Sequence, residues 1–252
     1  MTRIIIHGCN GRMGQVISRM AAEDPETEVA AGVDVSDHIV NPYPVFDSIG
    51  KCDVQADVII DFASAQAVDG LLSFCEEKKM PCVLCTTGLS EAQLRRVEEV
   101  SGKVAILRSA NMSVGINLLL KLLAEAAPVL AAAGFDMEIV EKHHNRKLDA
   151  PSGTALALAD ALNGALDQSY EYVYDRSGRR ESRPTGEIGI SAVRGGTIVG
   201  EHDVIFAGTD EVITFSHSAY SREVFAKGAV QAAKYLAGKP AGYYHMSDVI
   251  DG

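Results

Sequence analysis

The 252-residue sequence has few cysteines and lacks the marks of an exported or metal-dependent chain. Its five cysteines are an odd number, and Cys82 and Cys85, in a C-x-x-C spacing, have no second pair or matching histidine to complete a zinc set. The two flank Val83 and Leu84 in an expected buried strand, which favours core packing. The first residues lack the charged and then apolar order of a signal peptide. We therefore expect no metal and a reducing, cytoplasmic location.

Basic residues and long apolar runs are also in short supply. Lys and Arg number 23 against 34 Asp and Glu, which gives a formal net charge of −11. This excess of negative charge argues against general nucleic-acid binding, and it means that an anionic substrate needs a local basic site. No apolar run approaches the length of a membrane span, so we expect no membrane partner. The apolar content of 47% is still enough for real cores, and the length suits two domains.

A glycine-rich turn near the N-terminus is the first informative motif that is present. Residues 3–7 form a nearly continuous apolar run, as expected for a strand buried on both faces of a parallel sheet. A G-x-x-G-x-x-G run follows and leads into a helical pattern, and this strand–turn–helix context favours dinucleotide binding. Asparagine stands where the second glycine is usual, and it tolerates left-handed backbone better than most residues. The candidate cofactor-binding residues in this turn are Gly8, Asn10, Gly11, Arg12, Met13 and Gly14.

Asp34 ends the second expected strand, residues 28–33, and lies twenty residues after Gly14. An acid at this distance is expected to bind the ribose diol of NAD and to repel the 2′-phosphate of NADP. No arginine follows Asp34, and Arg12 is the nearest cation that a 2′-phosphate would meet. The sequence therefore favours NADH, with NADPH as the alternative. The alternative is that Asp34 only ends the strand and binds no cofactor.

Strands and helices go on alternating after this motif. Residues 57–62, 81–85 and 103–107 indicate buried strands, and residues 65–78 indicate a helix. This alternation predicts an α/β fold with a Rossmann-type doubly wound parallel sheet, which binds ligands beyond the carboxyl ends of its strands. Polar segments at two of these ends are candidate cofactor-binding loops, with ordinary turns as the alternative. Their residues are Thr86, Thr87 and Gly88, and Ser109, Ala110, Asn111 and Met112.

The densest cluster of polar side chains occupies residues 141–155. An alternating, strand-like pattern precedes it and a helical pattern follows it, so the cluster is expected on a connection, where catalytic groups are often held. His143 and His144 are the side chains best able to exchange a proton near neutral pH. Lys147 can pair with an anion or donate a proton. Together these groups can hold a small acidic substrate and protonate it, and a solvated polar loop is the plain alternative.

The same cluster ends in an expected helix start. Ser152 or Thr154 can cap this helix, and Gly153 lies between them. The free backbone N–H groups of the first turn and the positive end of the helix dipole suit a carboxylate or phosphate. The sequence therefore predicts an anion site beside the two histidines.

The chain changes character after residue 136. Residues 188–193, 203–207 and 211–217 indicate strands, and the last two flank Gly208-Thr209-Asp210 as in an antiparallel hairpin. With the strand before the cluster they predict a mixed or antiparallel sheet, separate from the first. Arg194 and His202 lie on the loop between two of these strands and can bind carboxylates, although loop residues of this kind are more often structural. Residues 222–237 indicate a helix that can pack on the first domain.

The run E-x-H-H-x-x-K-x-D-A-P-S-G-T-A, residues 141–155, strongly resembles the substrate-site signature of the 4-hydroxy-tetrahydrodipicolinate (dihydrodipicolinate) reductase family. The resemblance extends over essentially the whole chain. It implies that a reduced nicotinamide delivers hydride to 4-hydroxy-tetrahydrodipicolinate, with loss of water, in lysine and diaminopimelate biosynthesis. It also implies catalytic roles for His143 and Lys147. The implied substrate-binding residues are His144, Lys147, Ser152, Gly153 and Thr154.

The resemblance further implies that the second domain is an insertion with an open sheet, used for substrate binding and for a homotetramer. We expect a dinucleotide-binding domain over residues 1–111, an α+β substrate and oligomerisation domain over 112–217, and a segment over 218–252 that returns to the first domain. Two other functions stay open at this point. One is a reductase of another small acid, of the amino-acid dehydrogenase type, and the other is a protein that senses NAD without turnover.

Overall fold

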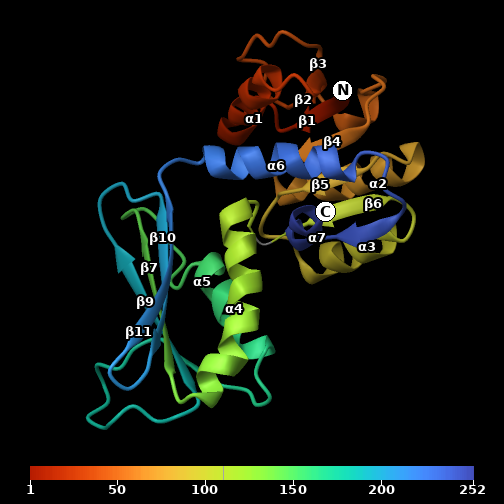
Figure 1. Cartoon of the computed structure of the whole chain (residues 1–252). Helices are drawn as coiled ribbons and strands as arrows, with labels where there is room; N and C mark the ends of the chain where they lie inside the picture. Colours follow the sequence, from red (N-terminus) through yellow and green to blue (C-terminus); the bar gives the residue numbers. More distant parts are fainter. Residues whose placement is uncertain (110) are drawn as a thin grey trace. The chain divides into compact units, whose positions relative to one another are not determined.

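The computed structural model describes residues 1–109 and 111–252 and divides the chain into two compact units (Figure 1). Unit 1 consists of Met1–Val114 and Glu223–Gly252, and unit 2 of Gly115–Arg222. Unit 2 is therefore an insertion in the sequence of unit 1. The domain boundaries given above for residues 1–111, 112–217 and 218–252 stay predictions.

Unit 1 is built on a seven-stranded sheet with the order β12-β6-β5-β4-β1-β2-β3. Every pair of neighbouring strands is parallel, and helices connect most of them, so the predicted doubly wound fold is confirmed. The strands are β1 Thr2–His7, β2 Thr27–Val33, β3 Val45–Phe46, β4 Val58–Asp61, β5 Cys82–Leu84, β6 Ala105–Arg108 and β12 Gly242–Tyr244. The helices are α1 Arg12–Glu23, α2 Val68–Lys78, α3 Glu91–Ser101, α6 Glu223–Leu236 and α7 Met246–Asp251.

The apolar run of β1 explains why this sheet has a core on each face. Ile4 and Ile6 point into one core, which α1 and α6 cover, while Ile5 points into the other, which α2 and α3 cover. All three isoleucine side chains are fully buried. Because both faces are covered, the strand reads as continuously apolar rather than alternating. The structure thus accounts for the pattern in residues 3–7.

Unit 2 is built on a five-stranded mixed sheet with the order β11-β10-β7-β9-β8. β7 pairs antiparallel with β10 and parallel with β9, and β10 and β11 form the predicted antiparallel hairpin. The helices α4 and α5 cover one face of this sheet (Figure 1). The strands are β7 Asp136–His143, β8 Glu171–Val173, β9 Glu187–Arg194, β10 Gly200–Ala207 and β11 Val212–Ala219, and the helices are α4 Val114–Ala132 and α5 Gly153–Gly164.

Helix α4 corrects one expectation from the sequence. It has 19 residues with a mean hydropathy of 1.7, so by length and composition it is apolar enough to cross a membrane, although no such run was expected. Leu119, Leu123 and Ala127 on one side of the helix pack into the core of unit 2. A helix that covers a sheet needs such an apolar side, which is the physical reason for part of this hydropathy.

Strand β7 extends further than the sequence indicated. Its last residue is His143, so the first histidine of the cluster lies on the sheet and not on the connection that follows. The expected helix over residues 65–78 begins with a short 3-10 turn, Ala65–Ala67, before α2. The sequence pattern did not indicate the end of β7, because Glu141 and His143 are polar residues at core-facing positions.

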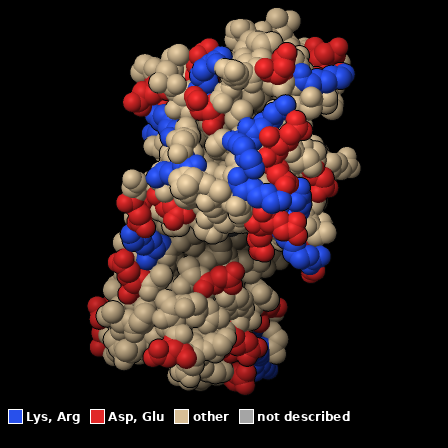
Figure 2. Space-filling model, turned by 90° about the vertical axis from the view of Figure 1, so that its right-hand side faces the viewer, with Lys and Arg blue, Asp and Glu red and all other residues tan. Residues whose placement is uncertain are grey.

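On the upper part of the face seen in Figure 2, Lys and Arg side chains lie among Asp and Glu, while the lower part shows Asp and Glu with few basic side chains. In the described part of unit 1, for example, Glu76 forms ion pairs with both Arg96 and Lys103. Basic side chains of this kind are neutralised locally and do not make a continuous positive surface.

Candidate active site

The glycine turn of unit 1 brings backbone segments too close for side chains. Gly8 has a φ of +83°, and a Cβ there would lie 2.9 Å from the carbonyl oxygen of Phe62. A Cβ on Gly14, in the first turns of α1, would lie 2.2 Å from the carbonyl oxygen of Gly8. Only glycine fits either position. The turn leads directly into the N-terminus of α1, which begins at Arg12. Free N–H groups at such a terminus suit a pyrophosphate.

Asn10 occupies the turn for a reason other than the expected one. Among the described non-glycine residues only Lys79 and Asp210 have positive φ, so Asn10 does not use left-handed backbone. Its N–H donates to Asp34 Oδ2 at 2.9 Å, and its side chain donates to the carbonyl oxygen of Ser36. The asparagine thus ties the turn to the segment after β2.

Asp34 lies in a pocket of about 460 Å³ at the carboxyl ends of β1, β2 and β4. Its second oxygen, Oδ1, accepts a hydrogen bond from the N–H of Ser36 at 2.9 Å. Both oxygens are therefore oriented by backbone N–H groups, and each keeps room for a further donor. Arg12, the first residue of α1, is exposed. Gly8, Gly11 and Asp34 line the pocket together with Val33, Phe62 and Ala63.

The other predicted cofactor loops follow β5 and β6 in unit 1. Thr86 is buried and donates through Oγ1 to Asp61 Oδ2 at 2.6 Å, while Asp61 Oδ1 lies 2.7 Å from His7 Nδ1. This chain of contacts joins the ends of three neighbouring strands. Thr87 and Gly88 continue the first loop, and Ser109 and Asn111 belong to the second. The side chain of Met112 packs in the core against α6, and Ala110 lies outside the described residues.

Unit 2 holds the histidine cluster on the core-facing side of β7. Buried and half-buried residues alternate along this strand, and the buried ones are Met137, Ile139, Glu141 and His143. The first two are apolar and the last two are polar, so the polar pair continues the line of core residues. Glu141 is fully buried, and His143 is 8% exposed.

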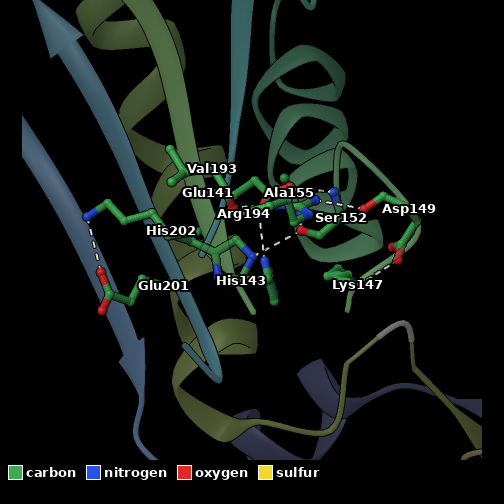
Figure 3. Close-up of polar contacts among 11 residues, drawn as sticks. Glu141, His143, Lys147, Asp149, Ser152, Ala155, Val193, Arg194, Glu201 and His202 are labelled. Carbon is green, nitrogen blue, oxygen red and sulfur yellow. Dashed lines mark hydrogen bonds and ion pairs between the residues drawn. The ribbon is translucent and has the colours of Figure 1, made fainter. Parts of the chain in front are cut away.

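Glu141 is the hydrogen-bonding centre of this cluster (Figure 3). Its Oε2 lies 2.7 Å from His143 Nδ1 and accepts from Arg194 Nη1 at 2.7 Å. Its Oε1 accepts from Arg194 Nη2 at 2.6 Å and from the N–H of Ser152 at 2.9 Å. Burial by itself raises the pKa of the Glu141 carboxyl, but the hydrogen bonds from Arg194, His143 and Ser152 outweigh it and hold the pKa below its ordinary value.

Ser152 caps helix α5, as predicted, while Thr154 is the second residue of that helix. The Ser152 Oγ accepts from the N–H of Ala155 at 3.1 Å and lies 3.2 Å from His202 Nε2. Gly153 is the first residue of α5, and a Cβ there would meet nothing within 4 Å, so space is open at the start of the helix. The carboxylate of Asp149 accepts a hydrogen bond from the Gly153 N–H, so an acidic group already occupies the start of α5.

The basic groups of the cluster differ in their surroundings. Burial lowers the pKa of His143, against the opposing effect of Glu141. Burial and the nearby His143 lower the pKa of His202 to about 4, so His202 is neutral at physiological pH. Lys147 Nζ lies 2.9 Å from Asp149 Oδ1. The Nδ1 atom of His144 is buried and has no hydrogen-bond partner among the described residues.

The sequence analysis assigned no role to Glu141, and it placed Arg194 and His202 on a loop, able to bind carboxylates but outside the catalytic set; the structure instead places Arg194 at the end of β9 and His202 on β10. A usable signal existed for two of them, because Glu141 and His202 continue the alternation of buried residues on β7 and β10. Polar residues in core-facing positions are unusual and mark such sites. Nothing local pairs Arg194 with Glu141, since this contact depends on the pairing of β7 with β9.

Comparison with known proteins gives matches over nearly the whole chain. The family models described as the N-terminus and the C-terminus of dihydrodipicolinate reductase match residues 2–112 and 115–250. The 4-hydroxy-tetrahydrodipicolinate reductase of Caldanaerobacter subterraneus subsp. tengcongensis is 56% identical over 99% of this chain and 98% of that protein. The protein of the same name from Clostridium tetani is 47% identical over 100% of this chain and 98% of that protein.

A solved structure supports the fold. The dipicolinate-bound dihydrodipicolinate reductase from a Paenisporosarcina species matches with a TM-score of 0.80 over 97% of each chain, at 24% identity. A myo-inositol dehydrogenase from Corynebacterium glutamicum matches with a TM-score of 0.58 at 15% identity. The arrangement of one parallel and one mixed sheet is thus found in other solved oxidoreductases.

Proposed function

We propose that this chain, which belongs to the dihydrodipicolinate reductase family, reduces 4-hydroxy-tetrahydrodipicolinate to tetrahydrodipicolinate with NAD(P)H and loss of water. The reaction belongs to lysine and diaminopimelate biosynthesis. Membership of the family confirms the resemblance of residues 141–155. The observation that carries the proposal is the cluster itself, in which two histidines and a lysine adjoin a capped helix N-terminus.

The residues of unit 1 fit a dinucleotide. Gly8 and Gly14 keep the turn free of side chains, α1 begins directly after it, and Asp34, whose two oxygens are held by backbone N–H groups, lines the pocket. The cofactor-binding set in our proposal is that of the sequence analysis, with the loops at Thr86–Thr87–Gly88 and Ser109–Met112 on the nicotinamide side. The nicotinamide, when bound in reduced form, supplies the hydride.

The protein's own part is to hold the substrate and supply a proton. The reduced substrate carries negative charge that a proton must quench, and His143 is our candidate for the acid. Lys147 stabilises the same charge or delivers the proton. His144, Lys147 and residues Ser152, Gly153 and Thr154 hold the two carboxylates. The unpartnered Nδ1 of His144 supports this assignment, and so does the start of α5, where the carboxylate of Asp149 already accepts a hydrogen bond from the Gly153 N–H.

We expect NADH to be used at least as well as NADPH, because Asp34 accepts from the ribose diol and no arginine follows it. Arg12 is the cation that a 2′-phosphate would meet if NADPH is used. We further propose a homotetramer in the cytoplasm, formed through unit 2. Edge strand β11 carries exposed Val212 and Ile213, which supports an interface there.

An assay with the biosynthetic substrate tests the function. Purified protein is mixed with NADH and with the fresh product that the preceding synthase makes from pyruvate and aspartate semialdehyde, and the cofactor absorbance is followed. Oxidation of NADH that depends on the synthase product supports the proposal, and a parallel assay with NADPH ranks the cofactors. No oxidation with either cofactor would defeat it. Turnover of another small imino or keto acid alone would favour the amino-acid dehydrogenase alternative.

A further inference from the structure

The buried carboxylate of Glu141 takes no part in the proton transfer proposed above. It lies on the core-facing side of β7, two residues before His143, where the preceding positions of the same line hold Ile139 and Met137. Burying a carboxylate among such neighbours is costly unless it is fully paired. An apolar residue would extend this core at lower cost. The acid at this position therefore calls for a reason other than packing.

The pairing of Glu141 is complete and comes from three different segments. An ionised carboxylate has about four sites that accept hydrogen bonds. His143 Nδ1 and Arg194 Nη1 occupy Oε2, while Arg194 Nη2 and the Ser152 N–H occupy Oε1. Arg194 is itself fixed, because Nη2 also donates to the carbonyl oxygen of Asp149 at 2.7 Å. Glu141 thus joins the candidate acid to the cap of α5 through one rigid group.

This pairing determines which nitrogen of His143 carries the exchangeable proton. An ionised carboxylate only accepts hydrogen bonds, so His143 Nδ1 must keep its hydrogen. The proton gained and lost by the ring is then that of Nε2. A Cβ on Gly200 would lie 3.1 Å from this Nε2, so the glycine places no side chain against it. The arrangement presents Nε2 and not Nδ1 to a substrate.

The groups that face His143 differ in sign. They are Glu141 on the same strand, Lys147 on the following loop, Arg194 at the end of β9 and His202 on β10, whose ring centroid is 5.2 Å from that of His143. Of these four, Glu141 is the one acid, and the others are neutral or positive. Without Glu141 the protonated ring would be buried next to two cations, Lys147 and Arg194, and no negative charge would compensate for either effect.

We propose that Glu141 is a positioning residue of the reaction: it holds the ring of His143 through Nδ1 so that Nε2 delivers the proton, and Arg194 fixes the Glu141 carboxylate. This inference rests on the proposed function only for the identity of the reaction. The orientation of His143, and the assignment of Nε2 as the nitrogen that gains and loses the proton, are properties of the free protein.

The test compares Glu141→Gln with Glu187→Gln. Glu187 is a matched control, because it is a buried carboxylate of the same sheet held by two arginines, Arg176 and Arg179, at the opposite end of β9. Glu141→Gln keeps an oxygen that can accept from Nδ1 but removes the charge that favours the protonated ring. We expect kcat/KM to fall ~10-fold or more above neutral pH and much less below it, because the alkaline limb moves to lower pH. Glu187→Gln should leave the limb in place.

A second measurement separates this inference from the proposed function. Nitrogen-15 imidazole spectra of the free protein follow the His143 ring without any turnover. In the wild type Nδ1 should stay protonated throughout the titration, and in Glu141→Gln the His143 titration should move to lower pH. Glu141→Asp, which keeps the charge, should restore most of the wild-type behaviour. Spectra with Nε2 protonated in the neutral ring would overturn the inference, even if the wild type reduces the substrate.

Arg194→Lys provides the test if Glu141→Gln does not fold. Lysine keeps the positive charge but cannot bind both carboxylate oxygens as arginine does. We expect kcat to fall with little change in KM, since His143 loses its orientation while the substrate contacts remain. A loss of activity that is equal at all pH values in the Glu141 and Arg194 variants, with an unchanged His143 titration, would show a merely structural role.

Discussion

Asp34 is the residue on which the choice of cofactor depends. Replacing it with Ala should weaken NADH binding more than NADPH binding, because the ribose diol loses its acceptor while the repulsion of a 2′-phosphate disappears. The measurement is KM and kcat for both cofactors. Asp37→Ala is the control, since Asp37 is a nearby, fully exposed acid. A wild-type preference for NADPH of tenfold or more, about 1.4 kcal/mol, would contradict our assignment of this position.

His143 and Lys147 are the residues on which the chemistry depends. We expect His143→Gln to keep the fold and the binding of nucleotide but to lower turnover by ~10²–10⁴, the usual contribution of an acid catalyst. Lys147→Ala should worsen both kcat and KM, because the lysine holds a carboxylate and stabilises the reacting atoms. Lys142→Ala is the control, since Lys142 points to the other side of β7 and pairs with Glu201 and Asp203.

The assignment fails if the His143 and Lys147 variants each keep more than about half of the wild-type kcat/KM, far less than a factor of ten in rate. A purely structural role would instead lower the melting temperature and spare activity.

The pH profile of the wild type follows from the burial of His143. An acid catalyst must be protonated, so activity is lost as pH rises through its pKa. Burial lowers the pKa of His143 despite the opposing charge of Glu141, so the decline should begin at a lower pH than for an ordinary, solvated histidine. The profile of kcat/KM against pH measures this directly. A decline only above the ordinary histidine range would point to Lys147 as the proton donor.

At the scale of elements, strand β10 places a residue without a side chain, Gly200, next to the ring of His143. A Cβ on Gly200 would lie 3.1 Å from His143 Nε2, while a Cβ on Gly195 would meet nothing within 4 Å. We expect Gly200→Ala to lower kcat by ~10-fold through displacement of the ring, and not to lower the melting temperature, because alanine suits a strand better than glycine does. Gly195→Ala in the preceding loop should leave kcat unchanged. Equal kcat values for the two variants would show that the ring has room to move.

Some strands and part of the cluster could be predicted from the sequence, and others could not. Buried parallel strands are continuous apolar runs, so β1, β4 and β5 were recognisable from hydropathy alone. The end of β7 was not, because Glu141 and His143 replace apolar residues at core-facing positions. The cluster was visible as histidines, lysine and a helix cap. Its centre was not, because Arg194 reaches Glu141 only through the pairing of two strands distant in sequence.

At the scale of the whole molecule, unit 2 carries apolar surface that a second copy would cover. Leu122, Val129 and Ile213 are exposed and line a groove of about 390 Å³ between α4 and β11. We expect light scattering at micromolar concentration to give an oligomer, and the mass of a tetramer. Ile213→Lys should shift the mass downward, because a charge on an edge strand opposes pairing. Val35→Lys, at a fully exposed position of unit 1, is the control. A monomeric wild type would contradict the proposed assembly.

The late return of the chain to unit 1 has a consequence for its synthesis. A ribosome completes Gly115–Arg222 before it has made α6 and β12, so unit 2 has all of its strands while the sheet of unit 1 still lacks its edge strand. Until Glu223–Gly252 emerges, β6 has an open edge, and Ile4 and Ile6 lack the helix that covers them. The nascent protein therefore exposes half of a nucleotide-binding core for the time it takes to translate unit 2, and a chain interrupted at Arg222 would be a substrate for chaperones and proteases.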